Sequence, residues 1–414
     1  MKMKLTRQEL QWIVYDIGNS AFILLVSTIL PIYFNSLSTA AGLAETTYLS
    51  YWSYATSVST LIVAFLGPIL GTIADFEGNR KKVFASSAIL GALALACFWI
   101  PSGWFSFLVL YAAGKVCYSL SLVVYDSMLT DVTTAERMDN VSTKGYAWGY
   151  IGSVIPFLIS LVLVLLYDKI GISLHTAMAA TFLINALWWF AFTFPLLKGY
   201  KQKNSVARKG GLMSQSFARI VATVKGLRHH RKILFFLISF FFYIDGVYTI
   251  IDMATAYGTS LGLDTTGLLL ALLLTQVVAF PASLTFAVLS KKYDTARLIR
   301  ICILAYFFIA CFAVQLDKLW EFWFLAFAVG CFQGGIQALS RSYFAKIIPE
   351  NKSGEFFGIF DICGKGASFL GLLVVGVVTQ ATGNQSFAVA CLSTFFLIGL
   401  FFFIKTERTA ADNK

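Results

Sequence analysis

The feature that most constrains this chain is a series of long apolar runs that continues along almost its whole length. About 20 apolar residues in an α-helix cross a bilayer core of ~30 Å. Since unpaired backbone amides are not tolerated in lipid, each run is predicted to be a membrane-spanning helix, and the fold class is all-α integral membrane. The twelve runs lie at 11–36, 48–74, 82–101, 104–130, 142–167, 173–197, 232–258, 264–290, 297–316, 320–346, 353–380 and 384–404.

Composition excludes soluble and nucleic-acid-binding classes. Apolar residues make up 58% of the chain and charged residues 13%, whereas a soluble domain carries about 25% charged residues. The net charge of +11 comes from loops between apolar runs and not from a basic patch with interleaved aromatics. The seven cysteines lie inside apolar runs without a C-x-x-C pair, and the three histidines have no metal-binding spacing. No metal, cofactor or nucleic-acid partner is therefore expected.

The distribution of Lys and Arg predicts the topology. With twelve spans, 28 basic residues fall on the side of the termini, against two (Lys169 and Lys318) in the opposite loops. The positive-inside rule then places both termini in the cytoplasm. The first apolar run is too long for a cleavable signal peptide and is expected to stay as a helix. We expect a multi-pass protein of the cell inner (plasma) membrane.

A long polar segment divides the chain. It predicts an N-terminal six-helix bundle at 1–197, a cytoplasmic basic linker at 198–231, and a C-terminal six-helix bundle with a short tail at 232–414. Within the linker, Phe217 and Val221 fall on one helical face and the basic residues elsewhere. This predicts an amphipathic helix on the inner membrane surface, and a regulatory partner site is the less favoured alternative.

The two halves also resemble each other. Tyr15 and Asp16 in the first apolar run correspond to Tyr243 and Asp245 in the seventh. Two repeated six-helix halves with a midplane site between them are a transporter architecture.

Residues 71–82, GTIADFEGNRKK, lie between the second and third runs. An acid at the end of a helix can cap the N-terminus of a neighbouring helix, and a glycine permits a tight turn. The segment resembles the major facilitator signature G-x-L-A-D-R-x-G-R-K, with Phe76 and Asn79 in place of two arginines. The resemblance implies a cytoplasmic gate, for which the candidates are Gly71, Asp75, Gly78, Arg80, Asp126 and Arg341.

Other stretches point to one branch of that superfamily. WIVYDIGNSAF, KGYAWGYIGS, DGVYTIIDMATAYG and, above all, residues 333–365 look like the bacterial branch that also contains the yeast vacuole effluxer linked to autophagy. The resemblance implies the major facilitator fold, with twelve transmembrane helices in two pseudo-symmetric bundles, and movement of a solute.

Charges inside the membrane are costly and usually face a cavity or a partner. At ~1.5 Å per residue, Lys115, Asp245 and Lys365 fall near the bilayer midplane. Asp252 follows Asp245 by about two helical turns. The candidates for substrate or proton contact are Asp16, Asn19, Lys115, Asp245, Asp252, Gln333, Gln337, Asp361 and Lys365. The alternative for the charges is structural ion pairing, as between Asp361 and Lys365 one turn apart.

These observations predict a secondary active transporter, not an enzyme. It would move a small polar solute by alternating access with proton coupling, and the resemblance adds amino acids or related metabolites as a substrate class. The expected partners are a small-molecule substrate, protons and the lipid bilayer, and the expected state is a monomer. A lipid or amphiphile flippase on the same fold is the alternative. A membrane enzyme is less favoured, since no His–Asp or Ser–His pairing occurs at depth.

Overall fold

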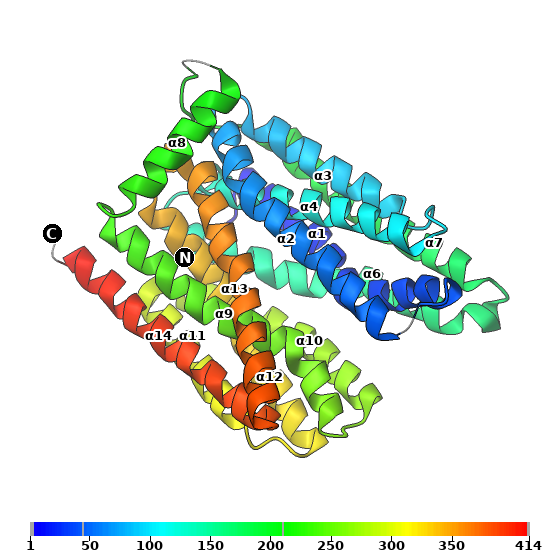
Figure 1. Cartoon of the computed structure of the whole chain (residues 1–414). Helices are drawn as coiled ribbons and strands as arrows, with labels where there is room; N and C mark the ends of the chain where they lie inside the picture. The colour runs from blue at the N-terminus through cyan, green and yellow to red at the C-terminus, as the bar shows by residue number, and fades with distance from the viewer. Residues whose placement is uncertain (1–3, 44, 209–210, 412–414) are drawn as a thin grey trace.

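The computed structural model describes residues 4–43, 45–208 and 211–411, which are almost entirely helical (Figure 1). The long helices are α1 (Arg7–Ala40), α2 (Glu45–Asp75), α3 (Arg80–Ala96), α4 (Trp104–Ser127), α6 (Met138–Ile170), α7 (Leu174–Gly199), α9 (Arg231–Ser260), α10 (Thr265–Leu289), α11 (Thr295–Ala313), α12 (Leu319–Ile347), α13 (Ser353–Thr382) and α14 (Gln385–Ala411). Shorter elements are α5 (Leu129–Val132), α8 (Leu212–Gly226) and η1 (Glu350–Lys352).

Ten helices in the described residues are long and apolar enough to cross a membrane. The two remaining long helices, α3 and α13, are not among these ten, for separate reasons. Helix α3 has 17 residues, fewer than the roughly 20 that a ~30 Å core requires. Helix α13 has 30 residues, but the side chains of residues 365–369 lie outside the described set. The predicted twelve spans are consistent with this architecture.

The helices form two groups, α1–α7 (the first half) and α9–α14 (the second half). In the first half α1 packs against α6 and α7, and in the second half α9 packs against α13 and α14. The halves meet where α2 lies along α13 and where α6 lies along α10 and α12. Figure 1 shows that they diverge away from the end that carries α8 and the last turn of α14. We call this end the basic end, because the helix ends at Arg80, Arg137 and Lys346 lie there.

Local sequence explains where the helices begin and turn. Thr6 caps α1: its hydroxyl accepts from the Glu9 amide at 3.2 Å, and the Glu9 carboxylate accepts from the Thr6 amide at 2.7 Å. This reciprocal capping box satisfies amides that a helix start leaves unpaired. Between α2 and α3, Gly78 has a φ of 72°, which other residues adopt only with strain. The tight turn predicted at Gly78 is present.

The internal repeat is visible as one contact made twice. Tyr15 on α1 lies 2.8 Å from the Ser121 hydroxyl on α4. Tyr243 on α9 lies 2.6 Å from the Ser340 hydroxyl on α12. Both tyrosines are fully buried, and each ties the equivalent pair of central helices together. The correspondence of Tyr15 with Tyr243 in the sequence therefore reflects an equivalent position in the two halves.

Candidate functional site

The most connected side chain between the halves is Arg341 on α12. It is 3% exposed. It lies 3.3 Å from the Asp16 carboxylate on α1 and 2.9 Å from that of Asp126 on α4, and it donates to the Ser142 hydroxyl on α6 at 2.9 Å. One guanidinium of the second half therefore joins three helices of the first half.

Three aromatic rings surround the same guanidinium. Its carbon lies 4.6 Å from the ring centre of Trp12, 5.6 Å from Tyr125 and 4.4 Å from Tyr146. Cations over aromatic faces gain roughly 0.5–2 kcal/mol each, more when water is excluded. The sequence predicted Asp126 and Arg341 as gate residues and Asp16 as a coupling residue, and the structure brings all three together.

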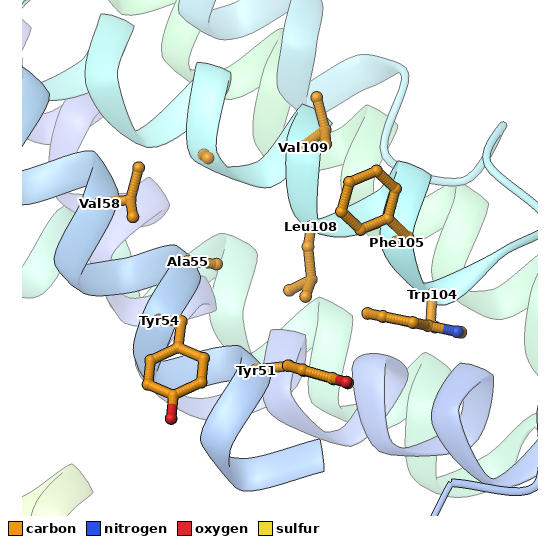
Figure 2. Close-up of a pocket in the computed structure, with 9 residues that line it drawn as sticks. Tyr51, Tyr54, Ala55, Val58, Trp104, Phe105, Leu108 and Val109 are labelled. Atoms are coloured by element: carbon orange, nitrogen blue, oxygen red, sulfur yellow. The ribbon is translucent and has the colours of Figure 1, made fainter. Parts of the chain in front are cut away.

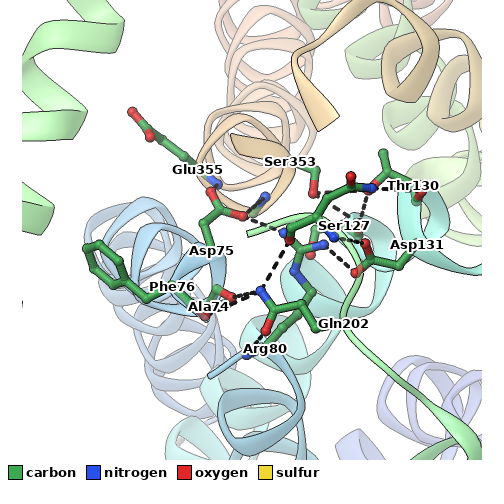
Figure 3. Close-up of polar contacts among 12 residues, drawn as sticks. Ala74, Asp75, Phe76, Arg80, Ser127, Thr130, Asp131, Gln202, Ser353 and Glu355 are labelled. Atoms are coloured by element: carbon green, nitrogen blue, oxygen red, sulfur yellow. Dashed lines mark hydrogen bonds and ion pairs between the residues drawn. The ribbon is translucent and has the colours of Figure 1, made fainter. Parts of the chain in front are cut away.

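A second network connects the α2–α3 turn with the linker (Figure 3). Arg80 is fully buried and pairs with Asp75 at 2.6 Å and with Asp131 on α5 at 2.7 Å. Tyr200, at the start of the linker, donates its hydroxyl to Asp131. Burial raises the pKa of Tyr200 above its ordinary value, which keeps this donor protonated. Asp131 also accepts from the backbone amide of Asn204 at 2.9 Å, so this network fixes the linker to the first half.

Asp75 extends the second network across to the other half. Its carboxylate accepts from the backbone amides of Gly354 at 2.8 Å and Glu355 at 3.0 Å, at the start of α13. A carboxylate at a helix N-terminus satisfies free amides and complements the helix dipole. A methyl group added to Gly71 would lie 2.1 Å from the Gly354 carbonyl oxygen. The backbones of α2 and α13 therefore touch, and only glycines fit there.

Two further polar contacts were not predicted. Arg219 on α8 lies 2.8 Å from Glu355 and 3.6 Å from Asp75, with its guanidinium carbon 5.3 Å from the Phe76 ring centre. The linker thus supplies a cation beside Phe76, which replaces a signature arginine. The sequence showed only that Arg219 lies outside the apolar face of α8. Its partner Glu355 is more than 100 residues further along the chain, so no local pattern links the two.

The other contact that was missed joins α6 and α12 near the basic end. Asp139 accepts from Lys346 at 2.6 Å, from the Ser342 hydroxyl at 2.6 Å and from the Thr295 hydroxyl at 2.6 Å. A single carboxylate of the first half thereby binds two helices of the second half. The only sequence signal for it was an acid in the first turn of a helix that follows a short loop.

The deeper charges divide into accessible and enclosed groups. Asp252 on α9 is exposed, and Lys115 on α4 is the cation whose charge acts on it. Asp245 has no exposed surface. It accepts from the Gly371 amide at 3.0 Å and the Thr249 hydroxyl at 3.3 Å, within the second half. The sequence placed both Asp245 and Lys115 near the midplane as candidates for substrate or proton contact; in this conformation Asp245 is enclosed between α9 and α13.

The remaining candidates lie along the same central helices. Asn19 donates to the Asp16 carboxylate at 3.1 Å. Gln333 is buried on α12, while Gln337, one turn on, and Asp361 on α13 are half-buried. The side chain of Lys365 lies outside the described residues, so its predicted pairing with Asp361 is not tested.

Comparison with known proteins identifies the family. Residues 40–136 and 130–414 match the family described as "Vacuole effluxer Atg22 like". The chain belongs to this family. The MFS-type transporter YxiO of Bacillus subtilis is 40% identical over 418 residues, covering 100% of this chain and 98% of that protein. Autophagy-related protein 22-1 of Aspergillus clavatus is 23% identical and covers 81% of this chain and 70% of its own length.

Solved structures show that this member of the vacuole effluxer family has the major facilitator fold. The human organic anion transporter MFSD10 aligns with a TM-score of 0.73 at 14% identity, covering 96% of this chain and 99% of that chain. FucP in the outward conformation gives a TM-score of 0.73 at 14% identity, with 96% and 98% covered. The fold class predicted from the sequence and the family resemblance are both confirmed.

Proposed function

We propose that this major facilitator protein is a secondary active transporter that moves a small polar solute by alternating access. The observation that carries the proposal is the position of the polar networks between the halves. The contacts centred on Asp75, Asp139 and Arg341 all lie toward the basic end, while the halves diverge at the other end (Figure 1). Closure at one end and separation at the other is what an outward-facing transporter requires.

The proposed solute contacts lie beyond the Arg341 network. Lys115 and Asp252 offer one positive and one negative group on facing halves, and Asp361 and Gln337 are half-buried on the neighbouring α13 and α12. Intramembrane charges that are not enclosed mark substrate or ion pathways. A polar or zwitterionic solute, such as an amino acid or a related metabolite, would satisfy this set. A counterflow screen of such solutes in proteoliposomes tests the proposal, and no exchange of any of them would argue against it.

Proton coupling is the proposed source of energy. Burial favours the neutral form of a carboxyl and a nearby cation favours its charged form. Asp16 is the first candidate carrier, because its ion pair with Arg341 joins the two halves and would break when they rock. Asp245 is the second candidate, because it is enclosed and one of its oxygens has no hydrogen-bond partner among the described residues.

Asparagine at these positions keeps the shape and removes titration. We expect Asp16→Asn or Asp245→Asn to abolish accumulation driven by a pH gradient while exchange at equal concentrations persists. Uptake and counterflow in the same proteoliposomes measure both. If both variants still accumulate solute in response to the gradient, proton carriage by these residues is wrong. Asp252→Asn is the matched control, because Asp252 is a proposed substrate contact. This variant should impair both gradient-driven accumulation and exchange at equal concentrations.

The proposed orientation places the basic end in the cytoplasm of the inner membrane, with 1–197 and 232–414 as the two moving bodies. We expect Lys318→Cys, whose side chain is 62% exposed in the parent, to react with an impermeant maleimide added outside cells. Lys201→Cys, in the linker, should react only after the membrane is opened. Both substitutions are made in a variant from which the seven native cysteines have been removed. Labelling of position 201 from outside would reverse the proposed topology.

The alternative function, a lipid flippase, would need an apolar cavity that is open to lipid. The apolar pocket shown in Figure 2 is the candidate for such a cavity. It has a volume of about 460 Å³ and lies between α2 and α4, lined among others by Tyr51, Trp104 and Leu108. Both helices belong to the first half, so rocking of the halves would not open the pocket alternately to the two sides. We assign it to contact with the bilayer, and the polar-solute proposal is favoured.

A further inference from the structure

A small pocket lies at the basic end between α8 and the start of α13. It has a volume of about 160 Å³. Its wall includes three side chains that can donate hydrogen bonds to an anion: Arg219 and His230 from the linker and Lys352 just before α13. Gly226 and Phe356 contribute the apolar part of the wall. Neither the proposed transport site nor the networks between the halves make use of His230 or Lys352.

Arg219 has donor capacity left over. One of its terminal nitrogens, Nη2, bonds to Glu355 at 2.8 Å. The other, Nη1, is buried and has no hydrogen-bond partner in the described part of the chain. A buried donor without a partner destabilises the protein, and more so when it is charged. An acceptor that enters the pocket would remove this cost.

The opposite face of α8 indicates where the pocket lies in the membrane. Met213, Phe217, Val221 and Val224 are 52%, 42%, 50% and 51% exposed, which is a continuous apolar stripe on a basic amphipathic helix. The Phe217 ring lies 6.4 Å from the ring of Phe65, a 63% exposed residue on membrane-spanning α2. A stripe that continues onto the lipid-facing surface of a spanning helix lies at the bilayer interface. The pocket is therefore at the level of lipid headgroups.

We propose that this pocket binds the phosphate of an anionic phospholipid headgroup, at the interface where the apolar stripe of α8 meets the bilayer. Phosphate oxygens accept from guanidinium and ammonium groups in short, charge-assisted bonds. The cationic choline or ethanolamine of a zwitterionic lipid would instead meet His230 and Lys352. Because the ligand contacts α8 and α13 together, and α13 must leave α2 when the basic end opens, the bound headgroup stabilises the closed basic end.

The test uses the purified full-length chain, titrated with phosphatidylglycerol or phosphatidylcholine and followed by native mass spectrometry. We expect tighter binding of phosphatidylglycerol. Lys352→Ala should weaken its apparent affinity by roughly fivefold, since a basic residue near an anionic lipid contributes about 1 kcal/mol. Lys225→Ala is the matched control, because it removes the same charge from an exposed position on α8 that does not line the pocket. It should change the affinity less than about twofold.

Three outcomes would overturn the proposal. Equal effects of Lys352→Ala and Lys225→Ala would mean diffuse attraction to a basic surface, without a built site. No preference for phosphatidylglycerol would exclude an anionic headgroup. If glycerol 3-phosphate displaces phosphatidylglycerol at equal concentration, the occupant is a soluble phosphate and the lipid assignment is wrong. An unchanged melting temperature of both variants in detergent confirms that the comparison is made on folded protein.

Discussion

Replacement of Arg341 by methionine is expected to destabilise the folded protein far more than removal of an exposed arginine. The substitution leaves Asp16 and Asp126 facing each other in the space between the halves without the cation that now lies 3.3 and 2.9 Å from them. Breaking a buried ion pair by removing one partner costs about 3–5 kcal/mol. Contact of the guanidinium with three aromatic rings is lost as well. The apparent melting temperature should fall by roughly 3–6 °C.

Two further variants separate an uncompensated charge from loss of packing. The triple variant Arg341→Met, Asp16→Asn, Asp126→Asn removes the two stranded charges and should recover most of the loss, since neutral groups of the same shape carry no comparable desolvation cost. Arg300→Met removes an arginine that is 42% exposed and lies 3.3 Å from Glu407, where pairs contribute about 0–1 kcal/mol. Melting curves at one fixed scan rate compare all three. If Arg300→Met and Arg341→Met melt alike, the central role of Arg341 is wrong.

The fold could be predicted from the sequence because the bilayer imposes simple physical rules. Apolar length determines each span, and Arg80, Arg137 and Lys346, which helped to predict one side of the membrane, lie at one end of the described structure. Helix ends and turns that depend on the local sequence could also be predicted. Asp75 ends α2 and caps a neighbouring helix, as expected from an acid at that position, and Gly78 makes the turn.

The partners of the buried charges could not be predicted, because they depend on which helix faces cross between the halves. Arg341 and Asp16 are 325 residues apart, and no local pattern links them. Sequence depth alone made Asp245 and Lys115 look equivalent. Their surroundings differ, since Asp245 faces the backbone of α13, while Lys115 acts on Asp252, about two turns further along α9. Arg219 was assigned to the polar face of a surface helix, and only the folded structure brings it to Glu355 at the start of α13.

A second large effect is expected from Gly354→Ala, which should move the protein away from the conformation that is closed at the basic end. The new methyl carbon would lie 2.3 Å from the Gly71 carbonyl oxygen and 2.8 Å from the Asp75 carboxylate. Non-bonded atoms do not approach so closely, so α2 and α13 must separate and Asp75 must give up its cap on α13. Each 1.4 kcal/mol lost by the closed form changes its population ratio tenfold. A single methyl group can therefore make opening of the basic end the dominant state.

Spin labels at Lys81→Cys and Lys291→Cys, two exposed positions on opposite halves at the basic end, measure this separation by double electron–electron resonance. The labels are placed in a background without the seven native cysteines. We expect the parent to give mainly short distances and Gly354→Ala mainly long ones.

Gly376→Ala is the matched control, because a methyl group there, on the same helix, meets no heavy atom within 4 Å among the described residues. It should leave the distances unchanged, and it should raise the helix stability slightly, since alanine favours helix over glycine by about 1 kcal/mol. A short-distance distribution retained in Gly354→Ala would mean that the contact between α2 and α13 does not control the closed state, and the gate would then depend on Arg341 and Asp139 alone.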